Sequence, residues 1–426
     1  MRVMIIGGGG REHALALSVR KSPLVSDLFV LPGNAGIAEI ATCVPIGAKE
    51  LGRIVAFAVE QHIEFAIVAP DDPLVMGLVD ELHAVDILCF GPEKKAAVIE
   101  GSKAFAKELM QKANIPTAEY AVFTDEREAV GYLASCAYPI VVKADGLALG
   151  KGVVIAQDFE EAKAAVYTMM AEKRFGASGE RVVIEEYLTG PEVSVLALTD
   201  GKTILPLPSS MDHKRVFDGD HGPNTGGMGA ISPNPYYTEE TAELCMERIY
   251  LPTVRALNSA GRTFKGCLYF GLMLTEFGPK VIEYNCRFGD PETQAVLPLI
   301  ESGLFEAMLA VEEERLTEVE LKVKRGACCC VALASAGYPG KYEAEKPIAI
   351  QTGELGEDAA VFHAGTKLQG ERIVTAGGRV LGVSAVGDTL ASAISRAYGA
   401  LRHIDFEGMH YRRDIGKTAL RASQGE

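Results

Sequence analysis

The chain contains 426 residues, more than a single hydrophobic core usually holds, and we therefore expect two to four packed units. Its formal net charge of -15 excludes a general nucleic-acid-binding role, because phosphate backbones would be repelled, and any anionic ligand needs a local positive site. The N-terminal segment lacks the pattern of a signal peptide and no run of about 18 apolar residues occurs, so we expect a cytoplasmic protein without a membrane partner.

Residues 1–101 alternate short apolar runs with helical stretches. The apolar runs are VMIIG, LFVLPGN, FAIVAP and ILCFGP, and helices are expected to begin near Glu12, Lys49 and Leu74. This rhythm predicts a doubly wound parallel sheet with loops at the carboxyl ends of its strands, where such sheets bind ligands.

Residues 102–322 form the second predicted region, an α+β arrangement with flexible glycine-rich loops. Its strands are expected at PIVVKAD, VVIAQ, RVVIEEYL, VSVLALT, CLYFGLMLTE and KVIEYN. Helices are expected over 103–113 and 160–171, and a long helix over 238–260. The last region, 323–426, is predicted to be a small mixed or antiparallel unit that ends in a helix.

Nine cysteines are scattered along the chain without a C-x-x-C pair, which argues against a disulfide framework. Cys328, Cys329 and Cys330 are adjacent in the apolar run ACCCVALASAG. Adjacent side chains on a strand point to opposite faces, so the three thiols cannot close around one metal ion. We predict a buried strand here, because cysteine is among the most buried residue types.

Two glycine-rich loops are candidates for phosphate binding. The turn GGGG follows the first strand and would place backbone N–H groups at a helix N-terminus, but the third glycine of the dinucleotide fingerprint is replaced by Glu12. Phosphate contact and a merely tight turn both remain open. GLALGKGV is one residue short of a P-loop, with Gly152 in place of Ser or Thr. It reads as a flap whose Lys151 reaches over phosphates, or as a hairpin loop with a solvated lysine.

Lys143 lies inside the apolar strand PIVVKAD, where an unpaired ammonium is costly. We therefore expect a bound phosphate, a salt bridge to a protein carboxylate or an edge position in the sheet. Glu283 and Asn285 are two residues apart in KVIEYN, so their oxygens face one side of a strand. A small number of hard oxygen ligands, completed by substrate phosphates, suits Mg²⁺. Arg287 follows, and its planar guanidinium can stabilise charge on a transferring phosphate. The alternative is a solvent-facing strand end with a helix cap at Asp290.

Two further segments have a ligand-binding composition. VVIEEYL ends in two carboxylates and is followed by Glu192, which suits an adenine held along the chain and a ribose held by a carboxylate. The loop 211–230 combines charged side chains with five glycines, which is typical of a loop that orders around a ligand and also occurs in ordinary surface loops. His213 and His221 lack the spacing of zinc ligands, and we do not expect zinc.

In combination, these motifs resemble the glycinamide ribonucleotide synthetase family of the ATP-grasp superfamily. The resemblance covers essentially the whole chain, through GGGGREHAL, PGNAG, GPEKKAAVIEGSKAF, IVVKADGLALGKGV, VIEEYL, DHKRVFDGDHGPNTGGMGA, VIEYNCRFGDPETQ and VFHAGTKL. The string RFGDPETQ is the most specific of them. The resemblance implies a substrate-binding domain over 1–101, an ATP-grasp domain over 102–322 with a mobile ATP-binding subdomain at 120–188, and a C-terminal domain over 323–426.

The resemblance also implies the reaction. ATP would phosphorylate the carboxylate of glycine, and the amine of 5-phosphoribosylamine would displace phosphate from glycyl phosphate, giving glycinamide ribonucleotide in purine biosynthesis. ATP and Mg²⁺, with Mn²⁺ as an alternative, are the implied cofactors. We expect a monomer or weak dimer, and the sequence leaves open whether the preceding pathway enzyme transfers the unstable amine directly. Such chemistry is mainly positioning and charge neutralisation, and needs no nucleophilic triad.

The site residues implied by the resemblance fall into four groups. The catalytic residues are Arg287, Lys143 and Asp290. The ATP-binding residues are Lys103, Lys143, Lys151, Gly152, Glu185, Glu186, Tyr187, Leu188 and Glu192. The substrate-binding residues are Gly9, Gly10, Arg11, Glu12, Asn34, Asp212, Lys214, Gly226, Gly227, Gly229, Arg287, Asp290, Pro291 and Glu292. The metal ligands are Glu283 and Asn285.

Two features depart from the pattern. The strand YFGLML offers no acidic metal ligand before Glu276, which predicts a smaller metal set than in many ATP-grasp enzymes, and Gly8 stands where relatives often carry Asn. The nearest alternative function is another purine-pathway ATP-grasp enzyme, such as a carboxylase or formyltransferase, against which RFGDPETQ argues. Alternatives from other classes are a nucleotide-dependent dehydrogenase, suggested by the glycine turn, and a non-catalytic ATP-binding module.

Overall fold

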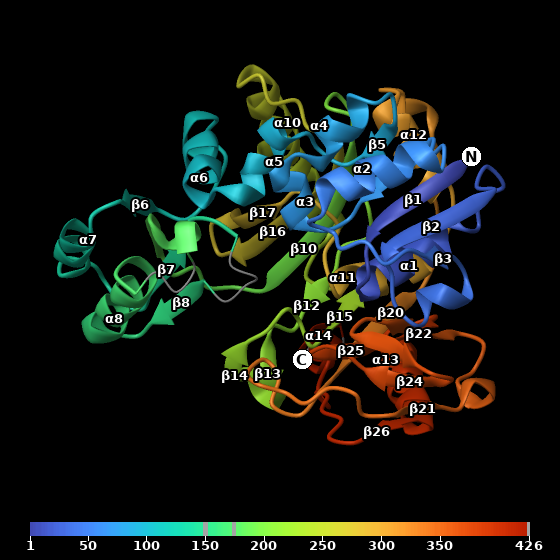
Figure 1. Ribbon diagram of the computed structural model, residues 1–426. Helices are drawn as coiled ribbons and strands as arrows, with labels where there is room; N and C mark the ends of the chain where they lie inside the picture. The colour runs from blue at the N-terminus through green and yellow to red at the C-terminus, as the bar shows by residue number, and fades with distance from the viewer. Residues whose placement is uncertain (148–151, 173–175, 424–426) are drawn as a thin grey trace.

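The computed structural model describes residues 1–147, 152–172 and 176–423 (Figure 1). The N-terminal region is a parallel sheet with the strand order β3-β2-β1-β4-β5. Its strands are β1 (Arg2–Gly7), β2 (Asp27–Pro32), β3 (Thr42–Cys43), β4 (Phe65–Val68) and β5 (Leu88–Phe90). Its helices are α1 (Gly10–Val19), α2 (Leu51–Glu60), α3 (Asp71–Met76), α4 (Leu78–His83) and α5 (Lys94–Gly101). The order reverses at β1, so the loops after β1 and β4 flank the switch point where such sheets bind ligands. The predicted doubly wound sheet is confirmed.

Both faces of this sheet are buried, and β1 shows why its sequence is continuously apolar. Val3 and Ile5 face one core, which also contains residues of α1 and of α12 (Leu304–Glu312). Met4 and Ile6 face a second core, with residues of α2, α3 and α4. A parallel strand covered on both sides has no solvent-facing positions, which explains the absence of polar alternation in VMII.

The second unit is a small antiparallel sheet with the order β6-β9-β7-β8, on the left of Figure 1. Its strands are β6 (Tyr120–Phe123), β7 (Ile140–Ala144), β8 (Val153–Ala156) and β9 (Val182–Glu186). The helices α7 (Glu126–Leu133) and α8 (Phe159–Met170) pack on it and close a separate hydrophobic core. The helix α6 (Lys103–Lys112) leads into this unit from the N-terminal sheet.

The central sheet has the antiparallel order β11-β10-β16-β17. Its strands are β10 (Glu192–Thr199), β11 (Ile204–Pro206), β16 (Gly266–Thr275) and β17 (Gly278–Asn285). It is followed by the short α11 (Glu292–Val296). Part of this sheet shares its hydrophobic core with the N-terminal sheet, so the carboxyl end of β17 lies at the junction of the two units.

The predicted long helix over 238–260 is a helical stretch with an irregular middle. It consists of α9 (Glu239–Cys245), a π-helical turn (Met246–Tyr250) and α10 (Leu251–Ser259). Pro252 lies in the first turn of α10 and has no N–H to donate to the preceding turn. A single π turn changes the hydrogen-bond spacing at such a point, so the helix continues past the missing hydrogen bond.

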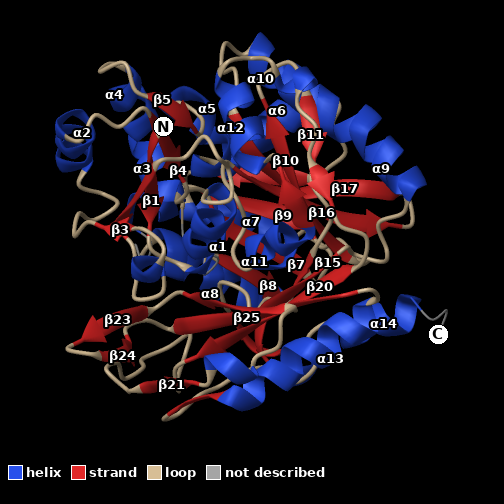
Figure 2. Ribbon diagram, turned by 90° about the vertical axis from the view of Figure 1, so that its right-hand side faces the viewer, coloured by secondary structure: helices blue, strands red, loops and turns tan. Residues whose placement is uncertain are grey.

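The C-terminal sheet contains two strands from the middle of the chain. Its order is β12-β15-β20-β25-β22, all antiparallel. The strands are β12 (Met211–Asp212), β15 (Gly229–Ser232), β20 (Ala327–Ala334), β22 (Ala359–His363) and β25 (Arg379–Gly387). The helix α13 (Leu390–Ala400) packs on β20 and β25, at the bottom of the view in Figure 2. Cys328, Cys329 and Cys330 lie on β20 and are fully buried, so the predicted buried strand is confirmed.

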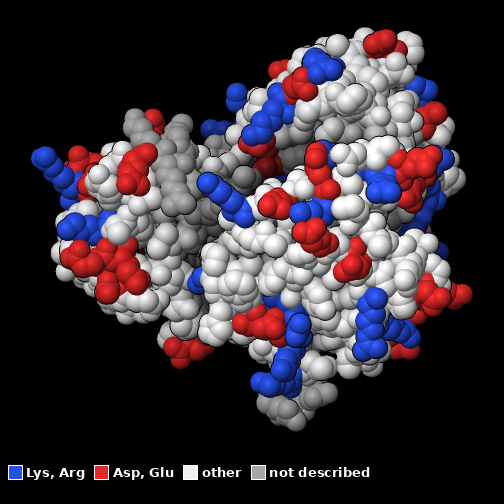
Figure 3. Space-filling model, turned by 60° about the horizontal axis from the view of Figure 1, so that its bottom comes forward, with Lys and Arg blue, Asp and Glu red and all other residues white. Residues whose placement is uncertain are grey.

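The remaining elements are short. They comprise the hairpins β13 (Arg215–Phe217) with β14 (His221–Asn224) and β23 (Thr366–Gln369) with β24 (Arg372–Thr375), and the pairs β18 (Ile300–Ser302) with β19 (Lys322–Val323) and β21 (Ile348–Ile350) with β26 (Ile404–Phe406), and α14 (Lys417–Ser423). In the described part of the chain, no helix is long and apolar enough to cross a membrane. On the face shown in Figure 3, basic and acidic residues are interspersed over a largely uncharged surface.

Candidate active site

The first glycine loop lies directly against the segment that follows β17. A Cβ atom at Gly9 would lie 3.5 Å from Asp290 Oδ2, and one at Gly10 would lie 2.6 Å from Gln294 Nε2. Arg11 Nη1 donates to the Phe288 carbonyl at 3.1 Å. The fold therefore brings the predicted substrate residues of the first loop together with those of RFGDPETQ, although the two segments are far apart in the sequence.

The N-terminal end of α1 binds its own glutamate. Gly9 N donates to Glu12 Oε2 at 2.6 Å, and Arg11 Nε donates to Glu12 Oε1, also at 2.6 Å. This carboxylate occupies the place where an anion would meet the helix N-terminus. Of the two interpretations that the sequence left open for GGGG, the tight, self-capped turn describes Gly9 and Glu12 in this structure.

Asn34, a predicted substrate contact, joins three segments of the protein. Its Nδ2 donates to Gly8 O at 2.9 Å and to His363 O at 2.7 Å. Its Oδ1 accepts from the backbone N–H groups of Gly36 and Ile37 at 3.0 and 2.9 Å. The side chain thus fixes the position of the first loop relative to β22.

Lys143 and a second buried lysine, Lys107, meet at one carboxylate. Lys143 lies on β7, and its Nζ is 3.0 Å from Glu185 Oε2 on the neighbouring β9. Lys107, on α6, approaches the same oxygen at 2.9 Å and donates to Thr117 Oγ1 at 2.8 Å. Burial lowers the pKa of Lys107 to about 8, against the opposing effect of Glu185. The protein-carboxylate alternative for Lys143 is therefore the one that this structure shows.

Lys103 is the first residue of α6, the helix that also carries Lys107. Its Nζ donates to Gly146 O at 2.9 Å. Burial lowers the pKa of Lys103, while Glu283 across the site raises it. Lys107, one helical turn further on, was missed by the sequence interpretation, although the spacing of four residues from Lys103 places both on one helix face. Lys151 lies outside the described residues, and Gly152 O accepts from Ala144 N at 2.8 Å.

The end of β9 and the segment that follows it contain the remaining predicted ATP residues. Glu186 Oε1 accepts from Lys280 Nζ on β17 at 2.5 Å. Tyr187 is exposed and Leu188 is half-buried. Glu192 Oε2, at the start of β10, pairs with Lys214 Nζ at 2.9 Å, which joins a predicted ATP residue to a predicted substrate residue.

Glu283 and Asn285, the predicted metal ligands, lie at the carboxyl end of β17. Burial raises the pKa of Glu283, but the positive charges of Lys214 and Lys143 help to hold it below its usual value, so the carboxylate is charged at neutral pH. Among the described residues, no group of three or more His, Cys, Asp or Glu side chains could hold a metal ion. Two hard oxygen donors fit Mg²⁺ when substrate phosphates and water complete its shell, and Mg²⁺ then supplies charge neutralisation on the phosphates.

Arg287 and Asp290 follow β17 and are both held by ion pairs. Arg287 Nη2 lies 3.0 Å from Glu100 Oε1, and its buried Nε has no hydrogen-bond partner among the residues that the structure describes. Asp290 Oδ1 lies 3.2 Å from Arg379 Nη2 and accepts from Gln294 Nε2 at 2.9 Å. Burial raises the pKa of Asp290, but Arg379 and other cations lower it below its usual value. A free guanidinium donor and a charged carboxylate therefore flank the same turn.

Two acidic side chains, Asp212 and Glu292, lie beside this turn. Tyr269 Oη donates to Glu292 Oε1 at 3.0 Å, and Ser194 Oγ lies 3.3 Å from the same oxygen. Burial, together with the negative charge of Glu292, raises the pKa of Asp212 well above its usual value. We therefore expect these two carboxyl groups to attract a cation such as an ammonium group. Ser194 and Tyr269 carry no sequence signal, because each is a single polar residue in an apolar strand.

Arg379 was also missed by the sequence interpretation, and it anchors the glycine-rich loop. Its Nη1 donates to Gly226 O at 2.6 Å, Gly227 O at 3.2 Å and Asp290 O at 3.0 Å. Gly227 has φ +108°, and a Cβ atom there would lie 2.3 Å from Pro291 Cδ. Only glycine fits at this close approach, so the composition of the loop reflects contact with the turn after β17. Gly229 belongs to β15.

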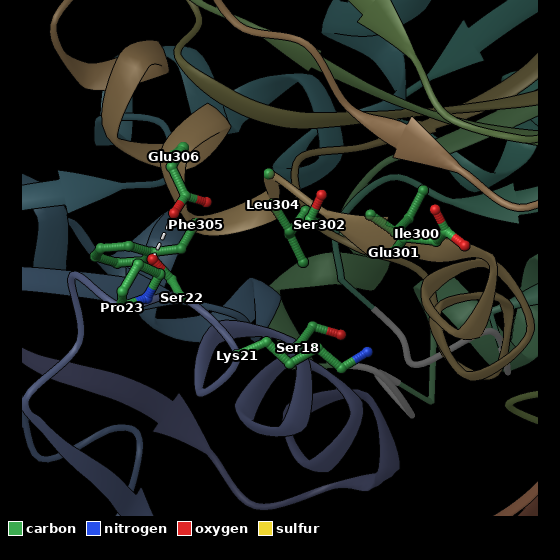
Figure 4. Close-up of a pocket in the computed structure, with 11 residues that line it drawn as sticks. Ser18, Lys21, Ser22, Pro23, Ile300, Glu301, Ser302, Leu304, Phe305 and Glu306 are labelled. Atoms are coloured by element: carbon green, nitrogen blue, oxygen red, sulfur yellow. Dashed lines mark hydrogen bonds between the residues drawn. The ribbon is translucent and has the colours of Figure 1, made fainter.

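Two cavities lie away from these residues. A small one of about 70 Å³ separates Lys21 from the N-terminus of α12, and Ser22 Oγ donates there to Glu306 Oε1 (Figure 4). A second one of about 540 Å³ lies between the β13–β14 hairpin and the loop 336–340. Neither is lined by a predicted ATP or metal residue, so the candidate site is located by the convergence of its side chains.

Comparison with known proteins supplies the family. Residues 1–100, 101–293 and 328–418 match the N domain, the ATP-grasp (A) domain and the C domain of phosphoribosylglycinamide synthetase. The chain belongs to the phosphoribosylglycinamide synthetase family. The predicted family, the ATP-grasp fold and an enzyme of the ligase class that uses ATP are thereby confirmed.

Individual relatives agree over the full length. Phosphoribosylamine–glycine ligase of Escherichia coli O157:H7 is 48% identical over 428 residues, which cover 100% of both chains. That of Caldanaerobacter subterraneus is 46% identical and covers 97% of this chain and 99% of the relative. The crystal structure of phosphoribosylamine–glycine ligase from Thermotoga maritima has a TM-score of 0.84 at 34% identity, covering 97% of this chain and 100% of that one.

A more distant neighbour shares the fold alone. The biotin carboxylase domain of 2-oxoglutarate carboxylase from Hydrogenobacter thermophilus, solved with MgADP and bicarbonate, has a TM-score of 0.76 at 18% identity. It covers 96% of this chain and 91% of that chain. The overall arrangement of the sheets is thus shared with a wider group of structures.

Proposed function

We propose that this protein joins glycine to 5-phosphoribosylamine with ATP, through a glycyl phosphate intermediate, and releases glycinamide ribonucleotide, ADP and phosphate. The observation that carries the proposal is the convergence of two groups of side chains. Glu283, Asn285 and Arg287 lie at the end of β17 or just after it. Lys103 on α6 and Lys143 on β7 lie close enough to interact electrostatically with Glu283. Family membership selects the substrates, whereas these side chains account for phosphoryl transfer.

In the first step, an oxygen of the glycine carboxylate attacks the γ-phosphorus of ATP and ADP leaves. Lys103, Lys143 and Arg287 would neutralise charge that spreads over the transferring phosphoryl oxygens. Glu283 and Asn285 would hold Mg²⁺. The carboxyl groups of Asp212 and Glu292 would bind the ammonium group of glycine, opposite to the cations that bind its carboxylate.

In the second step, the amine nitrogen of phosphoribosylamine attacks the carbonyl carbon of glycyl phosphate. The amide bond forms, the bond from carbon to the phosphate oxygen breaks, and the amine loses a proton. The first glycine loop and Asp290 lie next to each other at this point and would position the ribosyl amine. Positioning of two reactants out of water is sufficient for such a step.

The domain roles are part of the proposal. Residues 1–101 would bind phosphoribosylamine, 102–322 would bind ATP with 120–188 as a mobile subdomain, and 323–426 would complete the substrate site. We further propose a monomer or weak dimer that receives the unstable amine by transient transfer.

The test follows ADP formation with glycine and freshly generated phosphoribosylamine, each omitted in turn. We expect ADP release to require both substrates, and release without either one contradicts the ligase proposal. Glu283→Ala should abolish turnover, because one of the two protein ligands of the metal is lost. Full activity of this variant at low Mg²⁺ concentration would show that the metal ligands are assigned wrongly.

A further inference from the structure

Glu100 is a buried carboxylate that the proposed mechanism does not use. It lies in the last turn of α5, which packs against β17, and it is 7% exposed. A buried charged side chain is costly unless it is fully paired, so its partners indicate what it does. Those partners are three consecutive residues of the candidate site.

The two oxygens of Glu100 divide these partners between them. Oε2 accepts from Cys286 N at 2.7 Å and from Cys286 Sγ at 3.1 Å. Oε1 lies 3.0 Å from Arg287 Nη2. Oε1 also accepts from the Asn285 side-chain nitrogen at 2.9 Å, in the amide orientation in which that nitrogen meets acceptors only.

The contact with Asn285 decides which end of its amide is free. An ionised carboxylate only accepts hydrogen bonds, so it selects the nitrogen of the amide. The second acceptor near this nitrogen is the Tyr284 carbonyl at 3.3 Å, which makes the same selection. The oxygen of Asn285 therefore points away from Glu100, and only this oxygen can bind a cation.

The contact with Arg287 acts on the same segment. Glu100 pairs with one terminal nitrogen of the guanidinium, while the buried Nε has no partner in the described part of the chain. One carboxylate from a neighbouring helix therefore sets the orientation of both a predicted metal ligand and the predicted phosphate-binding arginine.

We propose that Glu100 is a positioning residue that orients the Asn285 amide oxygen toward the divalent cation and holds the Arg287 guanidinium at the transferring phosphate. This inference rests on the proposed function, because it requires the metal site at Glu283 and Asn285. Partners of this kind typically change metal affinity by about 10–100-fold when they are removed.

The first experiment measures Mn²⁺ binding without turnover, by electron paramagnetic resonance of the full-length protein with the non-hydrolysable analogue AMP-PNP. Glu100→Gln should weaken Mn²⁺ binding by about 10-fold or more, because the glutamine nitrogen competes with Asn285 for the role of donor. Binding of AMP-PNP without metal should change by less than about twofold. Mn²⁺ affinity equal to wild type in the folded variant overturns the inference.

The second experiment exchanges donor and acceptor. In Glu100→Gln/Asn285→Asp, the glutamine nitrogen can donate to one aspartate oxygen, and the other oxygen faces the cation. Asn285→Asp should therefore improve Mn²⁺ affinity at least about fivefold in the Glu100→Gln background and not in the wild-type background. An equal effect in both backgrounds overturns the inference. Turnover should stay low in the double variant, because Arg287 has lost its ion pair.

Two further variants separate the possible failures. If Glu283→Ala binds Mn²⁺ as tightly as wild type, the proposed metal site itself is wrong. If Glu283→Ala loses Mn²⁺ and Glu100→Gln does not, the positioning role alone is wrong. Glu306→Gln is the matched control, because Glu306 is also a helical carboxylate that accepts a side-chain hydrogen bond, from Ser22 Oγ at 2.5 Å, away from the site. Its Mn²⁺ affinity should equal that of wild type.

Discussion

The ion pair of Arg379 and Asp290 joins the C-terminal sheet to the turn after β17, and its energetic coupling can be measured. The two side chains are 21% and 19% exposed, so water screens them only in part. Removing one partner of a buried pair costs about 3–5 kcal/mol, mostly because the other charge is left uncompensated. With partial exposure, we expect Arg379→Met to lower the free energy of unfolding by about 3 kcal/mol and Asp290→Asn by about 2 kcal/mol.

The double variant should lose only about 3 kcal/mol, because the second change removes a charge that is already uncompensated, so the coupling energy is about 2 kcal/mol. Urea unfolding followed by circular dichroism measures all four proteins. The pair of Arg396 and Asp358 is the control, since it has the same chemistry but side chains 45% and 59% exposed. Its coupling should be below about 0.5 kcal/mol. Additive losses at Arg379 and Asp290 refute the reasoning.

Two further predictions concern acid sensitivity and the glycine-rich loop. Burial lowers the pKa of His13 to about 3. His13 therefore takes up a proton near pH 6.5 in the unfolded chain but stays neutral in the folded chain. As a result, the free energy of unfolding falls by about 2 kcal/mol between pH 7 and pH 5. Over the same pH range, the free energy of unfolding of His13→Gln, measured by urea unfolding, should fall by about 2 kcal/mol less than that of wild type. Equal losses in the two proteins contradict the assignment to His13. Gly227→Ala places a Cβ atom 2.3 Å from Pro291 Cδ and 2.6 Å from Asp212 Oδ1 at a positive φ, so the loop must shift. The melting temperature should fall, and ADP formation measured well below it should fall at least about tenfold. Gly370→Ala, which meets nothing within 4 Å, should retain activity, and equal activity of both variants contradicts the argument.

The sheets and helices could be predicted because their signals are local. The apolar run of β1 and the strand around Lys143 identify themselves within a few residues, and the motif after β17 indicates a phosphate site from Glu283, Asn285 and Arg287 alone. Each of these inferences needs only the spacing of neighbouring side chains and the period of the element.

The partners of these side chains could not be predicted, because they come from distant segments. The sequence shows that Lys143 needs an anion, but the anion that it meets, Glu185, is 42 residues away on another strand. Arg379 lies 89 residues beyond Asp290, whose carbonyl accepts from it. Glu100 and Cys286 are 186 residues apart. A lone charged residue on a surface helix has the same sequence pattern as one that closes a site.

The strands β12 and β15 come from the middle of the chain but belong to the C-terminal sheet. They limit where the chain can be divided into fragments that fold. A fragment that begins at residue 323 would contain β20 but not β15. The N–H and C=O groups of Cys328–Val331 on β20, which pair with Gly229–Ser232 in the whole chain, would then form an open sheet edge. Open edges promote association between chains. The complementary fragment would keep β12 and β15 as a hairpin of two short strands without a sheet to join. The C-terminal unit therefore forms its full sheet only as part of the whole chain, and separate fragments would have to be mixed to recover the glycine-rich loop in its place.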